Sequence, residues 1–119
     1  MLGLVLAVSA AGCSIAPKGF FQSRHDPAPI VRARAMGMGR ALPNSVVVPA
    51  LIEKLNDPDS VVRLTAHEEL RKRTGQDFGY APWADAPERA PAVNAWRQWW
   101  QTQQAGVSRK AGSTFLRRR

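Results

Sequence analysis

The residues best suited to chemistry in this chain lie around two histidines and one cysteine, and their spacing does not complete a site. The segment His67-Glu68-Glu69-Leu70-Arg71 begins like a zinc-protease motif, but that motif needs a second histidine where Arg71 stands. His25 and His67 are the only histidines, and Cys13 is the only cysteine. These residues are too few and too scattered for the usual zinc ligand set, so we expect no metal site.

Phosphate-binding and nucleophilic motifs are also missing from the sequence. The segment Gly37-Met38-Gly39-Arg40 is rich in glycine, but it lacks the preceding strand and the remaining spacing of a phosphate-binding loop. A serine–histidine–acid triad is recognised by its geometry, and nothing in the sequence supplies one. Glu68 and Glu69 fit a solvated helix face. We therefore expect a protein that is not an enzyme and that uses no cofactor.

One ten-residue pattern occurs twice, and the two copies must position the other residues. The segment from Asp57 to Ala66 repeats the segment from Asp26 to Ala35, with five identical positions. Its Asp-Pro pair stops one helix, because proline cannot donate the next backbone hydrogen bond. Asp59 or Ser60 can then cap the helix that follows. The spacing between the two copies is typical of stacked helical hairpins.

Apolar periodicity predicts the helices around these turns. One stripe predicts a helix over residues 45–55, and a second predicts a helix over residues 61–73 that ends with Gly75 as a left-handed cap. The two stripes consist of Val48, Leu51, Ile52, Leu55, Val62, Ala66 and Leu70. The upstream copy predicts a weaker helix over residues 29–42, because Gly37 and Gly39 each cost about 1 kcal/mol relative to alanine.

The downstream copy resembles the HEAT-repeat family, in which a proline-containing helix and an Asp-Pro-like turn precede a helix that begins Val-Arg-x-x-Ala-x-x-x-Leu. Residues 62–70 fit that pattern, and the whole resemblance covers residues 26–74. It implies an all-α fold, a short α-solenoid of helical hairpins, and a scaffold that binds a protein partner without catalysis. It also implies structural roles in the repeat for Asp26, Arg32, Asp57 and Arg63.

A tryptophan-rich helix is expected over residues 88–104, after an irregular loop. Val93, Trp96 and Trp100 have the spacing i, i+3 and i+7, and Trp99 lies beside them. A solenoid normally needs three repeats and capped ends, whereas this chain has about one and a half. We expect this helix to cover the open flank of the 61–73 helix, which gives one HEAT-like domain over residues 26–104 with a C-terminal Trp-rich capping helix.

The apolar N-terminus indicates export. Residues 1–12 are uncharged and too short to span a membrane comfortably, as a lipoprotein signal peptide would be. The small residues before Cys13 resemble a bacterial lipobox, which implies cleavage before Cys13, attachment of lipid such as palmitate there, and a membrane-anchored lipoprotein of the cell envelope. The alternative is an uncleaved apolar helix with Cys13 buried. Residues 13–25 form a tether, in which Phe20 and Phe21 are expected either to pack as a partial cap on the first repeat or to rest at the lipid interface.

Most of the net charge of +8 lies outside the predicted domain. Residues 26–104 contain ten Lys and Arg against nine Asp and Glu, so a nucleic acid partner is not expected. Residues 105–119 lack periodicity and are expected to be a disordered basic tail. Its basic residues are Arg109, Lys110, Arg117, Arg118 and Arg119. On an anchored protein this tail would contact membrane head groups or an anionic envelope polymer, or it would only keep the protein soluble.

Two surfaces are candidates for binding. The favoured one is a protein-binding face formed by Arg63, His67, Arg71, Tyr80 and Trp83. The alternative is a carbohydrate or polyanion binding module that uses the tail as an electrostatic arm. Its stacking platform would consist of Trp83, Trp99 and Arg97. A purely structural envelope protein is a third hypothesis, and the sequence identifies no particular partner.

Overall fold

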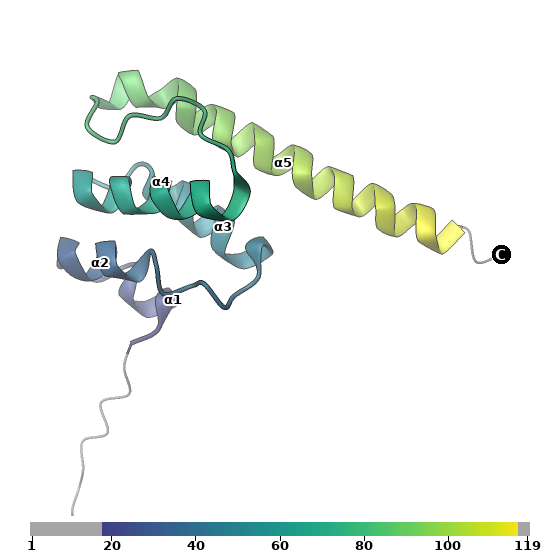
Figure 1. Cartoon of the computed structure of the whole chain (residues 1–119), viewed down its shortest axis with the longest axis horizontal. Coiled ribbons are helices and arrows are strands. Elements are labelled where there is room, and N and C mark those ends of the chain that lie inside the picture. Colours follow the sequence, from purple (N-terminus) through teal and green to yellow (C-terminus); the bar gives the residue numbers. More distant parts are fainter. Residues whose placement is uncertain (1–17, 117–119) are drawn as a thin grey trace, which may run out of the picture.

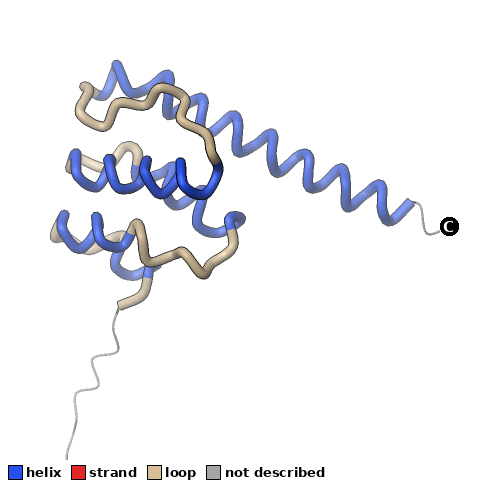
Figure 2. The backbone as a smooth tube through the Cα atoms, in the orientation of Figure 1, coloured by secondary structure: helices blue, strands red, loops and turns tan. Residues whose placement is uncertain are grey.

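Helices make up most of the described chain, which confirms the all-α prediction (Figures 1 and 2). The structure is a computed structural model that describes the backbone of residues 18–116 and the side chains of residues 18–112, and no strand occurs in that range. The helices are α1 (Phe20–Ser23), α2 (Pro29–Ala35), α3 (Asn44–Lys54), α4 (Ser60–Thr74) and α5 (Ala86–Leu116). The expected signal peptide at residues 1–12, the lipid site Cys13 and residues 117–119 lie outside the described residues.

The helices stack in tiers. α2 packs beside α4, and α3 packs against both α4 and α5. Figure 1 shows α2, α4 and the start of α5 one above another, each running in the same direction across the view. The two Asp-Pro turns therefore lie at the same edge of the stack, and the loop between α4 and α5 returns to that edge before α5 begins.

Local chemistry explains where α4 begins and ends. Asp59 is its N-cap, because the Asp59 carboxylate accepts hydrogen bonds from the amides of Val61 and Val62 at 2.9 and 3.2 Å. Gly75 ends α4 in the left-handed conformation with φ of 73°, and its amide donates to the Arg71 carbonyl at 2.8 Å. The predicted glycine cap is confirmed, and of the two possible N-caps the structure uses Asp59.

The upstream helix is shorter than the sequence predicts. α2 ends at Ala35 instead of residue 42, and residues 36–42 form successive turns. Gly39 in this segment is buried, and a Cβ atom there would lie 3.0 Å from Cγ2 of Val47 on α3. The chain passes so close to α3 at Gly39 that a residue with a side chain would crowd Val47. Glycine fits this close approach and also favours turns over a continued helix.

The core lies among α2, α3, α4 and the first half of α5. Its fully buried large side chains are Met36, Val47, Val48, Leu51, Leu55, Val62, Leu70, Val93 and Trp96. Phe20 of α1 joins this core at 4% exposure, whereas its neighbour Phe21 is 48% exposed. Only one of the two phenylalanines of the expected tether therefore covers the first tier.

α5 differs from its expected position. It packs against α3, and the helix pair α4–α5 makes no comparable contact within the described chain. The loop of residues 75–85 lies against α4 and the end of α3 instead, since Arg63 of α4 donates to the Pro82 carbonyl at 2.9 Å and Tyr80 donates to the carbonyl of Leu55, the C-cap of α3, at 2.6 Å. The indole of Trp96 still reaches α4, with its ring centroid 6.1 Å from that of His67.

α5 also differs from its expected length. The expected disorder over residues 105–119 is corrected for residues 105–116, which continue α5 as a helix. The side chains of residues 105–112 are all exposed. The core already holds the first part of α5 as a helix, so the helix can extend without the free-energy cost of nucleation. Apolar periodicity does not reveal this effect, because it reports only which residues face a core.

Candidate binding surface

An arginine holds each Asp-Pro turn at the edge of the stack. Arg32 donates through Nη1 to the carbonyls of Asp26 and Pro27, both at 2.9 Å. Arg63 donates through Nη1 to the carbonyls of Asp57 and Pro58, which hold the same places in the second copy, at 2.7 and 2.9 Å. The two copies of the sequence pattern therefore form the same turn with the same hydrogen bonds.

Arg32 also joins the first tier to the second. Its Nε and Nη2 atoms donate to the two carboxylate oxygens of Asp57, at 2.9 and 3.0 Å. Burial by itself raises the pKa of Asp57, but the hydrogen bonds from Arg32 and the amide of Asp59, with the charges of Arg32 and Lys54, hold that pKa below its ordinary value. The structure thus brings together the four residues for which structural roles were expected.

The third tier continues this edge with a clamped loop. Arg63 donates to the Pro82 carbonyl, and Arg89 of α5 donates through Nη1 to the Ala84 carbonyl. Both arginines are buried, at 8 and 9% exposure. Trp83 stands between the two bound carbonyls and is 65% exposed. Two buried side chains therefore fix the backbone on either side of an indole that faces solvent.

Most residues of the predicted protein-binding face are buried. Arg63, His67 and Tyr80 are 8, 4 and 5% exposed, so only Arg71 and Trp83 of the five predicted residues remain accessible. The sequence pattern treats arginine and histidine as surface residues, but here both side chains lie within hydrogen-bond distance of backbone carbonyls. These bonds replace hydrogen bonds to water, so the two side chains can be buried there.

His67 and Tyr80 fasten the α4–α5 loop to the body. The His67 ring lies 3.1 Å through Nε2 from the Asp77 carbonyl oxygen and stacks at a tilt on Tyr80, with centroids 4.9 Å apart. Burial raises the pKa of the Tyr80 hydroxyl, while the charges of Arg89 and Arg63 act in the opposite direction. Both rings act as structural supports for the loop.

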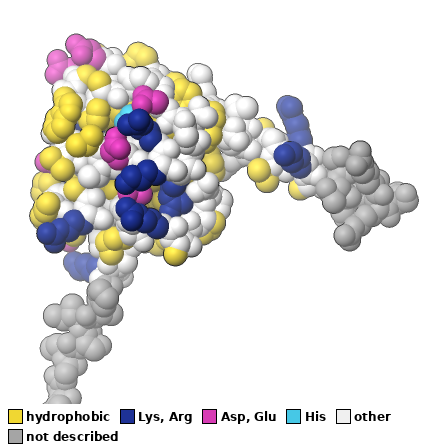
Figure 3. Space-filling model, in the orientation of Figure 1, with side chains coloured by type: hydrophobic (Ala, Val, Ile, Leu, Met, Phe, Trp, Pro, Cys, Tyr) yellow, Lys and Arg dark blue, Asp and Glu magenta, His cyan; other side chains and the backbone are white. Residues whose placement is uncertain are grey.

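Arg71 belongs to a face of paired charges at the end of α4. It lies 3.1 Å from carboxylate oxygens of both Glu68 and Asp77. On the same face, Arg40 and Lys72 both pair with the carboxylate of Glu69, at 3.3 and 3.4 Å. Figure 3 shows Lys and Arg side chains interleaved with Asp and Glu side chains over the middle of the molecule. The local charges largely cancel, so this face does not form an anion site.

The predicted stacking platform does not assemble. Trp99 is half-buried, and its ring lies 5.8 Å from Trp96, 6.2 Å from Trp100 and 6.3 Å from Phe78. Trp83 makes no ring contact with any side chain that the structure describes. The tryptophans therefore divide into one exposed indole on the clamped loop and a cluster that runs from the core to the surface of α5.

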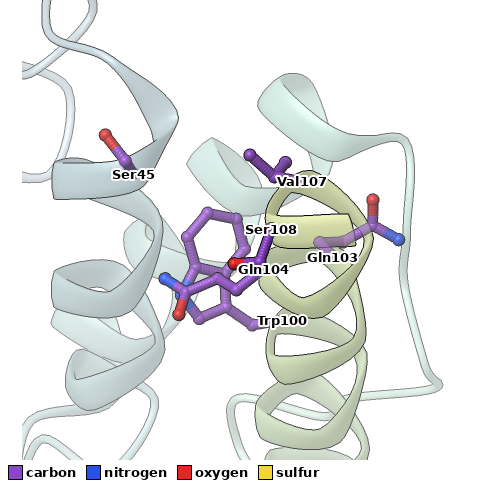
Figure 4. Close-up of a pocket in the computed structure, with 6 residues that line it drawn as sticks. All are labelled: Ser45, Trp100, Gln103, Gln104, Val107 and Ser108. Carbon is purple, nitrogen blue, oxygen red and sulfur yellow. The ribbon is translucent and has the colours of Figure 1, made fainter. Parts of the chain in front are cut away.

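A groove between α3 and α5 flanks Trp100, and the sequence did not predict it. One hollow of about 290 Å³ is lined by Ser45, Trp100, Gln103, Gln104, Val107 and Ser108. Figure 4 shows Trp100 and Gln104 reaching from α5 toward the helix that carries Ser45. A second hollow of about 240 Å³ lies on the other side of Trp100 and includes Arg97. The glutamines that follow Trp100 were the available signal for this groove, and Trp100 itself both lines the groove and packs against the core.

Further properties of the described residues bear on function. Side chains of residues 18–112 include no group of three or more His, Cys, Asp or Glu that could hold a metal ion. None of the helices in the described range combines the length and hydrophobicity needed to cross a membrane. Comparison with protein-family models, with curated proteins and with solved structures finds no match to this chain. The resemblance to HEAT repeats stays a prediction.

Proposed function

We propose that this chain is a lipid-anchored scaffold of HEAT-like repeats that binds a protein partner at the bacterial cell envelope. The observation that carries the proposal is the repeated turn, in which Arg32 and Arg63 make equivalent hydrogen bonds in the two copies of the pattern. Stacked turn-plus-helix units are the means by which helical-repeat proteins build extended binding surfaces.

A capped short solenoid fits the arrangement of the last tier. Repeat arrays require a terminal element whose outer face is polar. α5 buries Val93 and Trp96 toward the stack and exposes Glu88, Asn94 and Gln98 on other faces. This division supports the role of α5 as the cap, with α3 rather than α4 as the helix that it covers.

The proposed lipid anchor gives the stack a direction. Residue 18 lies at the α1 end of the stack, and the clamped loop lies at the α5 end (Figure 1). Anchoring through Cys13 would place the first tier toward the membrane and Trp83 away from it. A membrane-distal indole is available to a protein partner and is poorly placed to insert into the lipid that holds the anchor.

Trp83 is the favoured contact residue for that partner. Tryptophan is enriched among the few interface residues that carry most of the binding free energy. The hydrogen bonds from Arg63 and Arg89 order the loop before binding, so little conformational entropy remains to be lost. Arg71 is the other accessible residue of the predicted face, but its guanidinium is already paired with two carboxylates.

In-cell photo-crosslinking tests this proposal. A photoreactive amino acid at position 83 should give covalent adducts with a protein of the envelope fraction, whereas the same amino acid at position 21 should not. Phe21 is a matched control because it is also exposed and lies at the opposite end of the stack. Adducts that are absent at position 83, or equal at the two positions, contradict the proposed surface. Metabolic labelling with a fatty acid should label the wild type and not Cys13→Ser.

The groove around Trp100 supports a second candidate function, binding of an envelope carbohydrate. An aromatic floor bordered by glutamine amides and serine hydroxyls offers both an apolar face and hydrogen-bond partners for a sugar ring. Titration with soluble cell-wall oligosaccharides should then give saturable binding that Trp100→Ala abolishes and Trp83→Ala leaves unchanged. Equal loss in both variants, or no saturable binding to the wild type, contradicts this candidate.

A further inference from the structure

The two ends of α5 carry opposite charge. Asp85 immediately precedes the helix and Glu88 lies in its first turn, whereas no acidic residue follows Glu88 in the sequence. Arg109 lies near the far end of the helix, and the chain that follows it adds only basic charges. Figure 3 shows acidic side chains at the corner where α5 begins and basic ones on its projecting end.

The acidic end forms an acceptor edge, defined by Trp83, Asp85 and Glu88. All three side chains are exposed. Among the described residues, neither Asp85 nor Glu88 lies within ion-pair distance of a cation, whereas every other Asp and Glu pairs with a cation or accepts from a backbone amide. The edge therefore combines a clamped indole with two carboxylates that remain available to an incoming cation.

The basic end forms a projecting arm, defined as residues 105–112. Every side chain of the arm is exposed, and Figure 1 shows α5 leaving the stack well before its end. The arm contains Gly106 and Gly112, which lower helix stability. A helical segment of this length has little stability of its own in water, and most helices gain theirs by packing against a partner. The arm is therefore a segment that a docking surface would stabilise.

The arm cannot reach the acceptor edge of its own molecule. Ala86 is the first residue of α5, and Arg109 lies near the other end of the same helix. At a rise of about 1.5 Å per residue, these positions are about 35 Å apart along a helix that leads away from the edge. Any contact between the two surfaces must therefore form between separate molecules.

We propose that the arm of one copy of this chain docks on the acceptor edge of a second copy. Arginine suits this edge because its guanidinium stacks on an indole face and pairs with carboxylates at the same time. Arg109 lies against Trp83 of the other copy, between the charges of Asp85 and Glu88. This contact deepens the proposed function, because it identifies the protein that contacts Trp83 as a second copy of the chain. It rests on the proposed function only in that a protein partner contacts Trp83.

An anionic lipid surface is the competing occupant of the arm, and the structure favours the second copy. A lipid surface would use the positive charge of the arm, but it would leave the carboxylates of the acceptor edge, about 35 Å away along α5, without a cationic partner. It would also leave the exposed indole without a partner. A second copy matches both surfaces, since the sign of the charge on each is opposite to that on the other.

A charge-swap experiment with the full chain in nonionic detergent tests the proposal. Sedimentation equilibrium should show self-association of the wild type that weakens as salt is raised, because salt screens exposed ion pairs. Glu88→Lys alone and Arg109→Glu alone should each weaken association by roughly tenfold or more, since each loses one charged contact and gains a repulsive one. Mixing the two variants should restore association between unlike copies. The acidic arm of Arg109→Glu then meets the basic edge of Glu88→Lys, so the charges are again opposite.

Matched variants separate this contact from general charge effects. Arg34→Glu changes the net charge as Arg109→Glu does, but it lies on α2 and should leave association unchanged. Trp83→Ala should weaken association, whereas Phe21→Ala, at another exposed aromatic, should not.

Several outcomes would overturn the proposal. A wild type that stays monomeric at low salt, or a mixture of charge-swap variants that associates no better than either alone, eliminates docking between copies. Loss of binding to anionic phosphatidylglycerol vesicles in Arg109→Glu, with self-association intact, assigns the arm to the membrane instead. If self-association fails while position 83 still crosslinks to another envelope protein, this inference is wrong and the proposed function stands.

Discussion

Arg32 and Asp57 form a two-pronged ion pair between residues 25 positions apart in the sequence. The Nε–Oδ2 distance is 2.9 Å and the Nη2–Oδ1 distance is 3.0 Å, with only 13 and 3% of the two side chains exposed. This pair links the first Asp-Pro turn to the second, so it fixes how the two tiers sit on each other. Such bidentate pairs add geometric specificity to their charge interaction.

Removing Arg32 should strongly destabilise the fold. Arg32→Ala leaves the buried carboxylate of Asp57 without its main partner and frees the carbonyls of the first turn, so we expect a loss of about 3–5 kcal/mol in unfolding free energy. Urea unfolding followed by circular dichroism measures this change. Arg34→Ala, at an exposed position two residues away, should change stability by no more than about 0.5 kcal/mol. Similar losses in both variants would contradict a special role for the ion pair.

The pKa of Asp57 predicts a defined acid sensitivity. Because the folded-state pKa lies below the unfolded value of about 3.9, the carboxylate contributes its full stabilisation above roughly pH 4 and loses it as pH falls through the folded pKa. Thermal unfolding of the wild type should therefore shift to lower temperature as pH falls from about 4 to about 2. Asp57→Asn should be less stable at neutral pH and should flatten this acid limb. Parallel curves for the two proteins would show that other carboxylates govern the acid response.

Trp96 and Trp83 should have opposite importance for stability. Trp96 is fully buried, so Trp96→Ala should cost about 3–5 kcal/mol, whereas Trp83→Ala at a 65% exposed position should cost no more than about 0.5 kcal/mol. The buried Nε1 of Trp96 has no hydrogen-bond partner in the described protein. Trp96→Phe, which removes that donor and keeps a ring, should therefore cost less than Trp96→Ala. Melting temperatures of the three variants provide the measurement.

Two glycines should respond to alanine in opposite directions. Gly75 has φ of 73°, and alanine there should cost about 1–2 kcal/mol because its Cβ disfavours the left-handed conformation. Gly106 lies within α5, and a Cβ there would meet no atom within 4 Å. Gly106→Ala should thus stabilise the helix locally by up to about 1 kcal/mol and increase its signal in the far-ultraviolet circular dichroism spectrum. A loss of helix in Gly106→Ala would contradict the continuation of α5.

The sequence was most informative where structure depends on near neighbours. The predicted helices over residues 45–55 and 61–73 lie within one residue of α3 and α4, because apolar spacing, Asp59 and Gly75 define them locally. The HEAT-repeat resemblance implied structural roles for Asp57 and Arg63, and both residues make hydrogen bonds at the second turn. The resemblance to HEAT repeats also rests on this local signal.

The sequence was least informative about burial of polar side chains. Arg63 and His67 have the composition of a surface, yet both are buried, because the loop of residues 75–85 folds back and supplies carbonyl acceptors. These carbonyls lie on a different segment from α4, so the pattern of neighbouring residues does not predict the burial of the two side chains.

The sequence by itself determined that this protein is helical, that two of its turns are alike, and where most of its charge lies. Those properties depend on backbone hydrogen bonding and on side chains within a few positions of each other. Only the tertiary structure decided which side of the stack α5 covers, that Arg32 reaches Asp57, and that Trp83 faces solvent beside two clamped carbonyls. Packing between distant segments sets these relationships, because buried polar groups such as those of Arg32, Arg63 and Tyr80 find their hydrogen-bond partners on segments far away in the sequence.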